Sequence, residues 1–289
     1  MTEGERKAVG VSMWKLTWRR FRKNKLGMAG LVMICIIVTI AVLAPVIAPY
    51  SPIEQHLEDR LQPPSSKYLF GTDELGRDIF SRVLYGSRIA LSVGVLVALI
   101  SAAIGVTLGL VSGYYGGIVD EVIMRIVDIV WSFPSLILAL AIVSILGPGL
   151  INAMIAIALT MWASYARIVR GETLSVKEEP YIEAARAIGE SDIRILFSYI
   201  LPNVMSSILV LITYNIPSAI IIASSLSFLG LGAQPPTPDW GLMLSTARTY
   251  LTIAPWYSIF PGIAIMFTVL AFNFIGDGLR DAIQPERVS

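Results

Sequence analysis

Residues 195–238 read ILFSYILPNVMSSILVLITYNIPSAIIIASSLSFLGLGAQPPTP, a run of 44 residues without Asp, Glu, Lys or Arg. A transmembrane helix needs roughly 20 mainly apolar residues to cross a hydrocarbon core about 30 Å thick. The run ends in Gly230, Gly232 and Pro235-Pro236, which are turn signals. It therefore predicts one membrane span, over about 204–228.

Further runs of the same kind lie on both sides of this one. They cover residues 26–53, 89–119, 129–166 and 249–276. The run over 129–166 is interrupted by Gly147-Pro148-Gly149, a tight-turn signal, so it predicts a helical hairpin of two spans. Six spans are thus expected, over about 27–48, 89–112, 127–146, 150–169, 204–228 and 257–276.

The composition agrees with an all-α integral membrane protein and excludes several chemistries. Hydrophobic residues make up 55% and charged residues 15% of the 289 residues, against about 25% charged in an ordinary soluble domain. The only cysteine is Cys35 and the only histidine is His56. A zinc site built from four Cys or His ligands and an intrachain disulfide are excluded, and we expect no metal site and no catalytic residue. The net charge of +1 predicts no nucleic-acid partner.

The distribution of Lys and Arg predicts the orientation. With six spans both termini lie on one side, and that side carries 16 of the 22 Lys and Arg residues. Positively charged loops stay in the cytoplasm, so the N- and C-termini are expected there.

The segment over 13–22 is amphipathic. Its aromatic residues follow helical spacing, at Trp14, Trp18 and Phe21. A basic residue follows each of them directly in the sequence, at Lys15, Arg19 and Arg22. This pattern predicts a helix lying in the cytoplasmic interface of the bilayer. The alternative is a positively charged tail that only fixes the topology. The apolar stretch that follows is too long for a cleaved signal peptide.

Residues 170–202 form the longest loop on the predicted cytoplasmic side. Pro180 suits the first turn of a helix, and Gly189 is a residue at which such a helix stops. Ser191 is able to cap a second helix. We expect a short helix, a sharp turn and another helix, with Ala184 and Ala185 giving a slim surface. A solvated loop with ordinary helix propensity is the other interpretation.

The same loop carries a family pattern. Glu183-Ala184-Ala185, three residues, Gly189 and then Leu201-Pro202 resembles the EAA motif of ABC importer permeases; Tyr199 stands where that family often has Ile. The resemblance implies a coupling helix that docks into a cleft of an ATP-hydrolysing subunit. The residues it implies for ATPase coupling are Tyr181, Glu183, Ala184, Ala185, Arg186, Gly189, Leu201 and Pro202.

Two longer strings narrow the family. Residues 70–88, FGTDELGRDIFSRVLYGSR, and 227–244, SFLGLGAQPPTPDWGLML, resemble the second, C-type permease of dipeptide, oligopeptide and nickel importers. The resemblance implies a type I ABC importer permease fold in a prokaryotic inner or plasma membrane. It also implies a heterodimer with a second permease, two ABC ATPase subunits and an extracytoplasmic substrate-binding protein.

The chain has no Gly-x-x-x-x-Gly-Lys-[Ser/Thr] phosphate loop and no Gly-Lys pair at all. Such a loop supplies the backbone N–H groups and the lysine that hold nucleotide phosphates. We therefore expect no enzyme activity and no cofactor on this chain, with ATP and magnesium on partner ATPase subunits. The expected organisation is a cytoplasmic basic segment over 1–25, the first span and a long external loop over 26–88, a transport core over 89–276 and a cytoplasmic tail over 277–289.

Two polar groups are candidate sites outside the coupling loop. The first group lies in the first and the last external loops. It is interpreted either as a contact for the binding protein or as an internally paired structure, and its mixed charges favour the paired structure. Its residues are Asp73, Arg77, Asp78, Arg82 and Trp240. The second group lies in span five; its residues are Thr213, Tyr214, Asn215, Ser218 and Ser224, which line a translocation path or bond between helices.

Two further features concern helix packing. Asp128 is expected to pair with Arg125 at the inner end of span three, and a functional charge is the alternative. Gly94, Gly105 and Gly109 are expected to allow close helix packing in span two.

The function these features predict is the import of di- or oligopeptides, or of a related solute, driven by ATP on partner subunits. An ion-coupled secondary transporter is the main alternative, and it would show mid-membrane carboxylates or internal repeats; neither is evident. A membrane-embedded enzyme would need a convergent catalytic set, and a structural scaffold would not need the full loop motif. The solute itself is not specified by the sequence.

Overall fold

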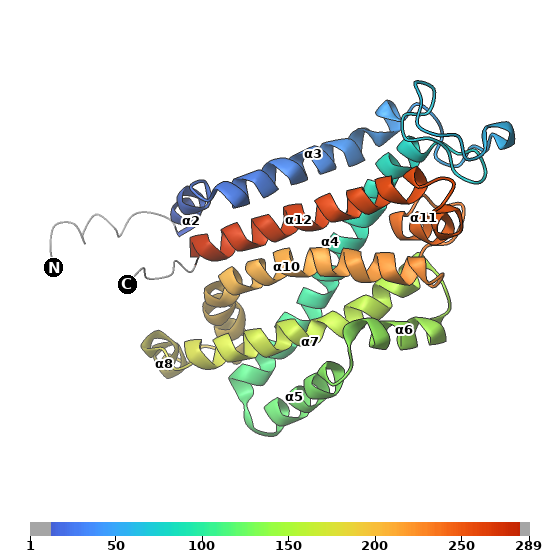
Figure 1. The fold of residues 1–289 in the computed structure, drawn as a ribbon. Helices are drawn as coiled ribbons and strands as arrows, with labels where there is room; N and C mark the ends of the chain where they lie inside the picture. The colour runs from blue at the N-terminus through green and yellow to red at the C-terminus, as the bar shows by residue number, and fades with distance from the viewer. Residues whose placement is uncertain (1–12, 284–289) are drawn as a thin grey trace.

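The computed structural model describes residues 13–283, which form a bundle of long helices (Figure 1). The helices are α2 Met13–Phe21, α3 Lys25–Ile47, α4 Ile79–Tyr115, α5 Gly117–Trp131, α6 Ser135–Leu146, α7 Leu150–Val176, α8 Pro180–Ala187, α9 Asp192–Arg194, α10 Leu201–Phe228, α11 Trp240–Ala247 and α12 Trp256–Ile283. A π-helical turn over Ile195–Ile200 joins α9 to α10. Residues 284–289 of the predicted tail over 277–289, residues 1–12 of the basic segment over 1–25 and the side chain of Trp14 lie outside the described residues.

Five of the six predicted spans are confirmed as helices long and apolar enough to cross a membrane: α3, α4, α7, α10 and α12. The third span is not the straight helix predicted over 127–146. Instead α5 and α6 meet at a 94° bend, so the chain has five spans, or six if this bent pair is one. The bend lies beside Pro134, whose ring and missing N–H prevent a continuous helix.

Several helices extend beyond the predicted spans. α4 begins at Ile79 rather than near residue 89, because the Asp78 carboxylate caps it by accepting a hydrogen bond from the Ser81 N–H at 2.8 Å. α7 continues to Val176, past Arg167 and Arg170. Charge-free length measures the part of a helix inside the hydrocarbon, so it misses the charged turns that project beyond it.

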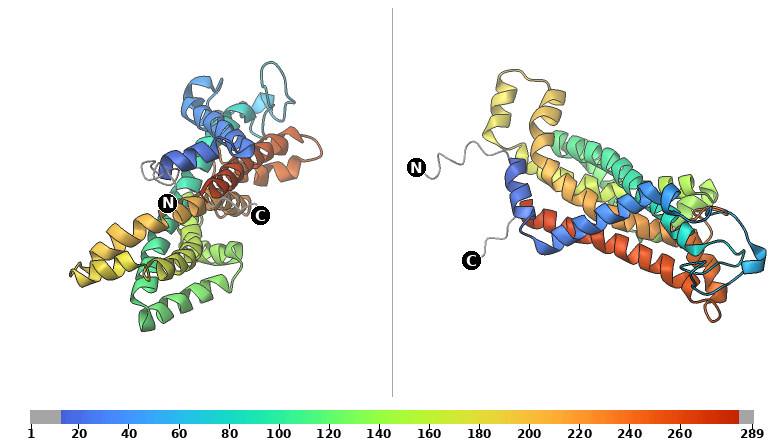
Figure 2. Two further views of the ribbon diagram at one scale, coloured as in Figure 1. Left: turned by 90° about the vertical axis from the view of Figure 1, so that its left-hand side faces the viewer. Right: turned by 90° about the horizontal axis from the view of Figure 1, so that it is seen from above.

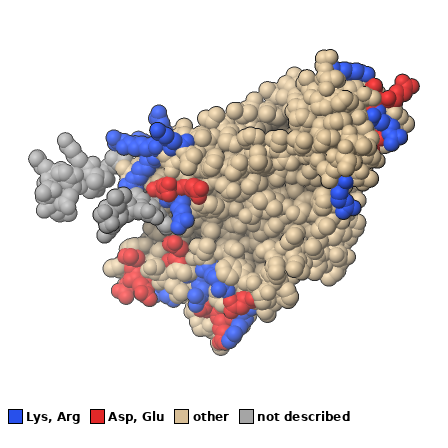
Figure 3. Space-filling view, in the orientation of Figure 1, with Lys and Arg blue, Asp and Glu red and all other residues tan. Residues whose placement is uncertain are grey.

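The charges gather at two opposite ends of the bundle. One end, called here the α8 end, holds α2, α8 and the last turns of α12; the other, called the loop end, holds residues 48–78 and α11 (Figures 1 and 2). Figure 3 shows Lys, Arg, Asp and Glu at these two ends and an uncharged surface between them. This belt is the surface that a bilayer requires.

The predicted helix near the N-terminus is present as α2, and it packs against α12. Phe21 is buried, whereas the Trp18 side chain is 51% exposed. The Asn24 side-chain amide donates a hydrogen bond to the Asp281 carboxylate at 2.8 Å. α2 is therefore fixed to the α8 end of the bundle.

The expected role of glycine in span two is confirmed at the contact of α4 with α7. A Cβ atom at Gly105 would lie 2.3 Å from the Trp162 carbonyl oxygen, and one at Gly109 would lie 2.7 Å from the Ala166 carbonyl oxygen. At Gly94 the same atom would meet the Ile220 side chain of α10 at 2.8 Å. Small residues let backbones approach closely, and this is how helices associate inside a membrane.

We predict that Gly105→Leu destabilises the protein by about 1–3 kcal/mol or more, because the new side chain overpacks the contact of α4 with α7. The matched control is Gly171→Leu on α7, where an added Cβ meets no atom within 4 Å. The measurement is the temperature at which the purified protein loses its monodisperse size-exclusion peak. Equal midpoints for the two variants would contradict this account of the packing.

Candidate functional site

The loop over 170–202 folds as expected into a short helix, a turn and a second helix. Pro180 occupies the first turn of α8. At its C-terminus Gly189 has a φ of +83°, and the Glu190 N–H donates to the Ala185 carbonyl oxygen at 3.1 Å. An added Cβ at Gly189 would meet no atom within 4 Å, so glycine is needed there for the left-handed backbone conformation alone.

One face of α8 attaches the loop to the rest of the protein. Ile182 and Ala185 are 0% and 3% exposed and pack among Leu110, Val169 and Ile200. Ala185 was expected on the slim docking surface, whereas in this chain its side chain is buried in the apolar cluster. It allows α8 to lie close to α4 instead.

Tyr114, at the end of α4, holds both parts of the loop. Its hydroxyl donates a hydrogen bond to the Asp192 carboxylate at 2.7 Å, and the Arg186 guanidinium lies 5.1 Å from the ring centroid. The loop is therefore anchored by a buried apolar face and by polar contacts with one tyrosine. Arg186 thus makes a contact within the chain in addition to its place in the motif.

The opposite face of the loop is exposed and partly apolar. Ile188, Ile193 and Phe197 have exposed fractions of 76%, 69% and 54%. Tyr181, Glu183 and Ala184 are exposed beside them. Partial burial of the Tyr181 hydroxyl raises its pKa, and the charge of Glu179 raises this pKa further. Leu201 and Pro202 lie apart from this face, in the first turn of α10. Exposed apolar patches of this kind mark sites of interaction with proteins, membranes or ligands.

A polar cleft of about 340 Å³ lies at the bend between α5 and α6. Hydroxyl and amide side chains from three helices line it, together with aromatic residues beside the bend: Trp131, Phe133, Ser135, Thr160, Ser164, Asn215 and Ser218. Among the described residues, none with a charged side chain lines this cleft. It is therefore a neutral polar surface inside the belt that crosses the membrane.

The five polar residues predicted to line a path along span five do not share one cavity. Asn215 and Ser218 line the cleft. Ser224 lines a separate hollow beside α11 and α12. Tyr214 faces a third hollow near the α8 end, where its hydroxyl donates a hydrogen bond to the Asp277 carboxylate at 2.5 Å. Thr213 bonds to the Val210 carbonyl oxygen of its own helix at 2.7 Å.

The expected pairing of Asp128 with Arg125 is wrong. The Asp128 carboxylate pairs with Arg167 on α7, whose guanidinium also lies 4.2 Å from the Trp131 ring centroid. Arg125 instead lies 3.8 Å from the Glu121 carboxylate on its own helix. Asp128 and Arg167 are far apart in the sequence, and only the packing of α5 against α7 brings them together.

The charged residues at the loop end form an internal network. The Asp73 carboxylate is fully buried, accepts a hydrogen bond from the Arg77 Nε at 2.6 Å and lies 3.6 Å from the Arg82 Nε. Arg82 also donates to the Pro52 carbonyl oxygen at 2.7 Å. Asp73, Arg77, Asp78 and Arg82 are all buried, and Asp73 pairs with both arginines, as the internally paired interpretation expected. A contact between this loop and a binding protein stays a prediction.

The outer positions of this loop differ from its interior. Hydrogen bonds from Lys67 and Tyr68 lower the pKa of the half-buried Asp59 carboxyl, whereas burial raises the pKa of the Asp78 carboxyl at the cap of α4. Trp240 is 3% exposed, and its indole N–H donates to the Val83 carbonyl oxygen at 3.0 Å. Trp240 therefore fixes α11 to α4 rather than presenting a contact surface.

Several residues of the site were not predicted from the sequence. Ser135, Thr160 and Ser164 line the cleft, and Ile188 and Phe197 dominate the exposed face of the loop. The Phe133-Pro134 pair inside a charge-free run is the signal that would have indicated the bend. Nothing in the sequence indicates that α7 turns its hydroxyl groups towards that bend.

Comparisons with known proteins place the chain among transport proteins. A family model described as a binding-protein-dependent transport system inner membrane component matches residues 105–288. A second model, the N-terminal TM domain of oligopeptide transport permease C, matches residues 12–64. The glutathione transport system permease protein GsiD from Escherichia coli and that from Shigella boydii are each 50% identical to the chain over 274 residues, covering 94% of this chain and 90% of the relative.

Solved structures show the same fold at lower identity. Two crystal forms of the MetNI methionine ABC transporter in inward-facing conformations contain a chain that matches with TM-scores of 0.56 and 0.57. The sequence identities are 20% and 19%, and the matches cover 70% and 71% of this chain and 96% and 98% of the other. The likeness is therefore one of fold.

We predict that Asp73→Asn destabilises the protein by about 3–5 kcal/mol, because it leaves the buried guanidinium groups of Arg77 and Arg82 without their shared counter-charge. The control is Asp59→Asn in the same loop, whose partner Lys67 is 60% exposed, and which is expected to change stability little. The measurement is thermal unfolding of the purified protein together with protease protection of the loop. Stability of Asp73→Asn equal to that of the control would refute the role given to this network.

Proposed function

This chain belongs to the family of binding-protein-dependent transport system inner membrane components, and on that premise we propose that it forms one half of the gated path of a bacterial importer for short peptides. It is a permease subunit of an ABC importer and a multi-pass protein of the bacterial inner membrane. ATP hydrolysis resides on separate subunits, and an ABC permease of this type works with ATPase and binding-protein partners.

The proposed orientation puts the α8 end in the cytoplasm and the loop end outside. The excess of Lys and Arg at the termini and in the loop over 170–202 supports it. α2 would then lie in the cytoplasmic interface, with Trp18 and the neighbouring basic residues towards the lipid headgroups. The proposed assembly holds a second, different permease chain and two ATPase subunits.

The observation that carries the coupling role is the two-faced loop at the α8 end. Its inner face is fixed by Ile182, Ala185 and Tyr114, whereas its outer face exposes Ile188 and Ile193. A partner that binds the outer face is therefore able to move α8 and α4 together. The proposed coupling set is Tyr181, Glu183, Ala184, Arg186, Gly189, Leu201 and Pro202, extended here by Ile188, Ile193 and Phe197, with Ala185 as an anchor.

The cleft at the bend is the proposed part of the translocation path. Irregular backbone is tolerated at membrane depth only where protein or water covers it, so this break belongs at a protein-lined or water-lined surface. The Ser218 and Thr160 hydroxyls donate to carbonyl oxygens of their own helices, and their remaining lone pairs are able to accept hydrogen bonds from a solute. Asn215 and Ser218 are assigned to this path; Thr213, Tyr214 and Ser224 are assigned to helix contacts outside it.

The proposed solute is a short peptide. The relatives at 50% identity are named for glutathione transport, and glutathione is the first candidate. A neutral cleft of hydroxyl and amide groups fits a peptide backbone without selecting one side-chain charge. The direct test is uptake of radiolabelled glutathione by vesicles that contain this chain with its partner permease, ATPases and binding protein, and uptake no faster than in vesicles without ATP would refute the assignment.

The coupling role predicts that Ile188→Asp lowers solute-stimulated ATP hydrolysis at least about tenfold, the change that corresponds to a loss of about 1.4 kcal/mol. A charged side chain on the exposed apolar face opposes docking without disturbing the buried face. Gly189→Val and Glu183→Ala are expected to uncouple transport from hydrolysis in the same assay. ATPase rate and uptake are measured on the same vesicles.

Ile188→Val is the matched control for the coupling test, because it keeps an apolar side chain at the same exposed position. It is expected to retain both activities. Membrane insertion and yield are compared for all variants by immunoblot. Full coupling in Ile188→Asp would remove the exposed face from the contact with the ATPases.

The path predicts that Ser218→Phe lowers the rate of uptake at least about tenfold, since the ring occupies the cleft and adds a barrier of about 1.4 kcal/mol or more. Thr107→Phe is the control, because Thr107 is exposed on α4 and bonds only to the Ala103 carbonyl oxygen of its own helix at 2.7 Å. Initial uptake rates are measured at matched amounts of assembled complex. Equal rates for the two variants would place the path elsewhere.

A further inference from the structure

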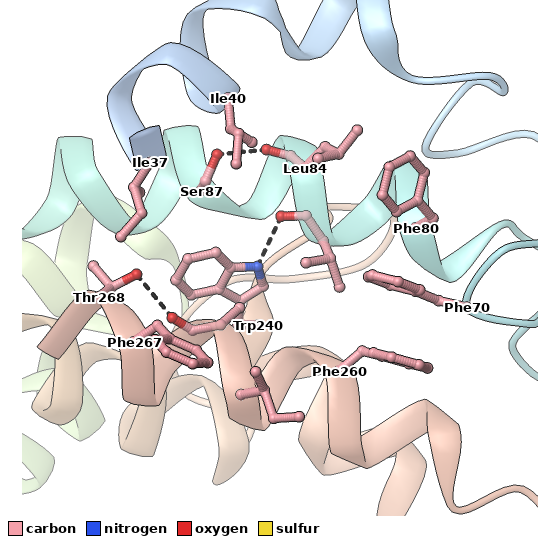
Figure 4. Close-up of a pocket in the computed structure, with 13 residues that line it drawn as sticks. Ile37, Ile40, Phe70, Phe80, Leu84, Ser87, Trp240, Phe260, Phe267 and Thr268 are labelled. Atoms are coloured by element: carbon pink, nitrogen blue, oxygen red, sulfur yellow. Dashed lines mark hydrogen bonds between the residues drawn. The ribbon is translucent and has the colours of Figure 1, made fainter. Parts of the chain in front are cut away.

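A further hollow, of about 250 Å³, lies among α3, α4, α11 and α12 towards the loop end (Figure 4). α3 contributes Ile37 and Ile40, and α11 contributes Trp240. α12 contributes a single stripe that includes Phe260, Ile263 and Phe267. None of these residues takes part in the coupling loop or the polar cleft.

The polar atoms that line this hollow are already bonded within the protein. The Ser87 hydroxyl donates to the Leu84 carbonyl oxygen at 2.6 Å, and the Thr268 hydroxyl donates to the Ala264 carbonyl oxygen at 2.8 Å. The Trp240 indole N–H is bonded to the Val83 carbonyl oxygen, and Figure 4 draws all three hydrogen bonds. Among the side chains that line the hollow, only Ser87, Thr268 and Trp240 carry polar atoms, so a polar solute would lose more hydrogen bonds to water than it gains here, whereas hydrocarbon loses nothing.

The hollow is large enough to hold an apolar group. Protein interiors contain few voids larger than a water molecule. An apolar cavity of about 150 Å³ stays free of water and takes up an apolar ligand such as benzene. A hollow of about 250 Å³ with an apolar lining therefore fits an apolar occupant rather than water.

The packing closes the hollow at two ends and leaves apolar side chains exposed between them. At the loop end Phe70 stacks on Phe260 with ring centroids 3.8 Å apart, and Phe80 meets Phe70 edge-on at 4.9 Å. Towards the α8 end α3 and α12 meet closely, since a Cβ at Gly30 would lie 2.6 Å from the Ala271 carbonyl oxygen. Ile263 and Phe267, between these closures, remain 41% and 49% exposed.

The open side continues the exposed apolar surface of α3. α3 is a membrane span, and Val32 and Ile36 on it are each 54% exposed. α3 also lies in the segment that matches the N-terminal TM domain model, whereas α11 and α12 lie in the segment that matches the transport family model. The hollow is thus at the seam between two parts of the chain, and bilayer hydrocarbon has direct access to it.

We propose that this hollow is a lipid site, which takes one acyl chain of a phospholipid from the leaflet at the loop end. The chain enters between Ile263 and Phe267 and lies against Trp240 and Ile40. It fills the seam between α3 and α12 where their side chains do not meet. The site serves the attachment of α3 to the rest of the permease, and it is separate from the path of the solute.

The test uses the assembled transporter in vesicles of phosphatidylethanolamine and phosphatidylglycerol that contain a phospholipid with a diazirine in its acyl tail. After illumination, adducts are mapped by mass spectrometry and are expected on residues 260–268 and 37–40. Ala264→Phe fills the hollow, and the adduct on 260–268 is then lost. Ala29→Phe, the same change at an exposed position of α3 away from the hollow, retains it.

A second arm keeps the proposal testable if Ala264→Phe does not assemble. Phe267 is replaced by the photoreactive p-benzoylphenylalanine in the otherwise unchanged complex, and Ile36 is replaced in the same way as a bilayer-facing reference. The complex is washed with detergent before illumination, and capture of phospholipid at position 267 with none at position 36 supports the site. Capture of a second protein chain at position 267, or equal loss of lipid at both positions, overturns it.

Discussion

The close packing of α4 against α7 is the interaction on which the remaining structure depends. Apolar side chains gain little by leaving lipid for one another, so helices in a bilayer associate through close van der Waals contact and hydrogen bonds. Gly105, Gly109 and Gly113 repeat every fourth residue, and each places the backbone of α4 where a Cβ would collide with α7. The last turns of α7 lead directly to α8. The contact of α4 with α7 therefore also fixes where the coupling loop lies.

α4 connects the two charged ends of the molecule. It has 37 residues, which at about 1.5 Å per residue make a rod roughly 55 Å long. One end begins at Asp78, beside the buried pair of Asp73 and Arg77, and the other ends at Tyr114, which holds Asp192 of the coupling loop. The loop that closes the outer end and the helix that meets the ATPases in the proposed assembly are thus attached to one rigid element.

The sequence predicts the parts of this architecture that are fixed locally. A run of apolar residues and a turn at Gly189 are both recognised from a few neighbouring residues. The spans and the turn of the coupling loop were therefore predicted. The pairing of Asp128 with Arg167 and the burial of Asp73 depend on residues brought together by packing, and no local pattern contains them. Pro134 was a local signal for the bend. The prediction of a straight span was based on the length of the run without charges, and that length does not distinguish a straight helix from a broken one.

The two hollows inside the membrane belt have opposite chemistry, and the backbone explains why. At the bend, α6 starts after Pro134 without a side-chain cap, so its first N–H groups need partners from outside the helix. Such groups are tolerated only beside protein or water, and Asn215 and Ser218 are beside them in the same cleft. The hollow under α3 is bounded by unbroken stretches of helix whose hydroxyls are bonded to their own carbonyl groups. Backbone groups freed by a break in a helix need protein or water beside them, whereas an unbroken helix satisfies its own groups, so the proposed path and the proposed lipid site follow the pattern of backbone hydrogen bonding.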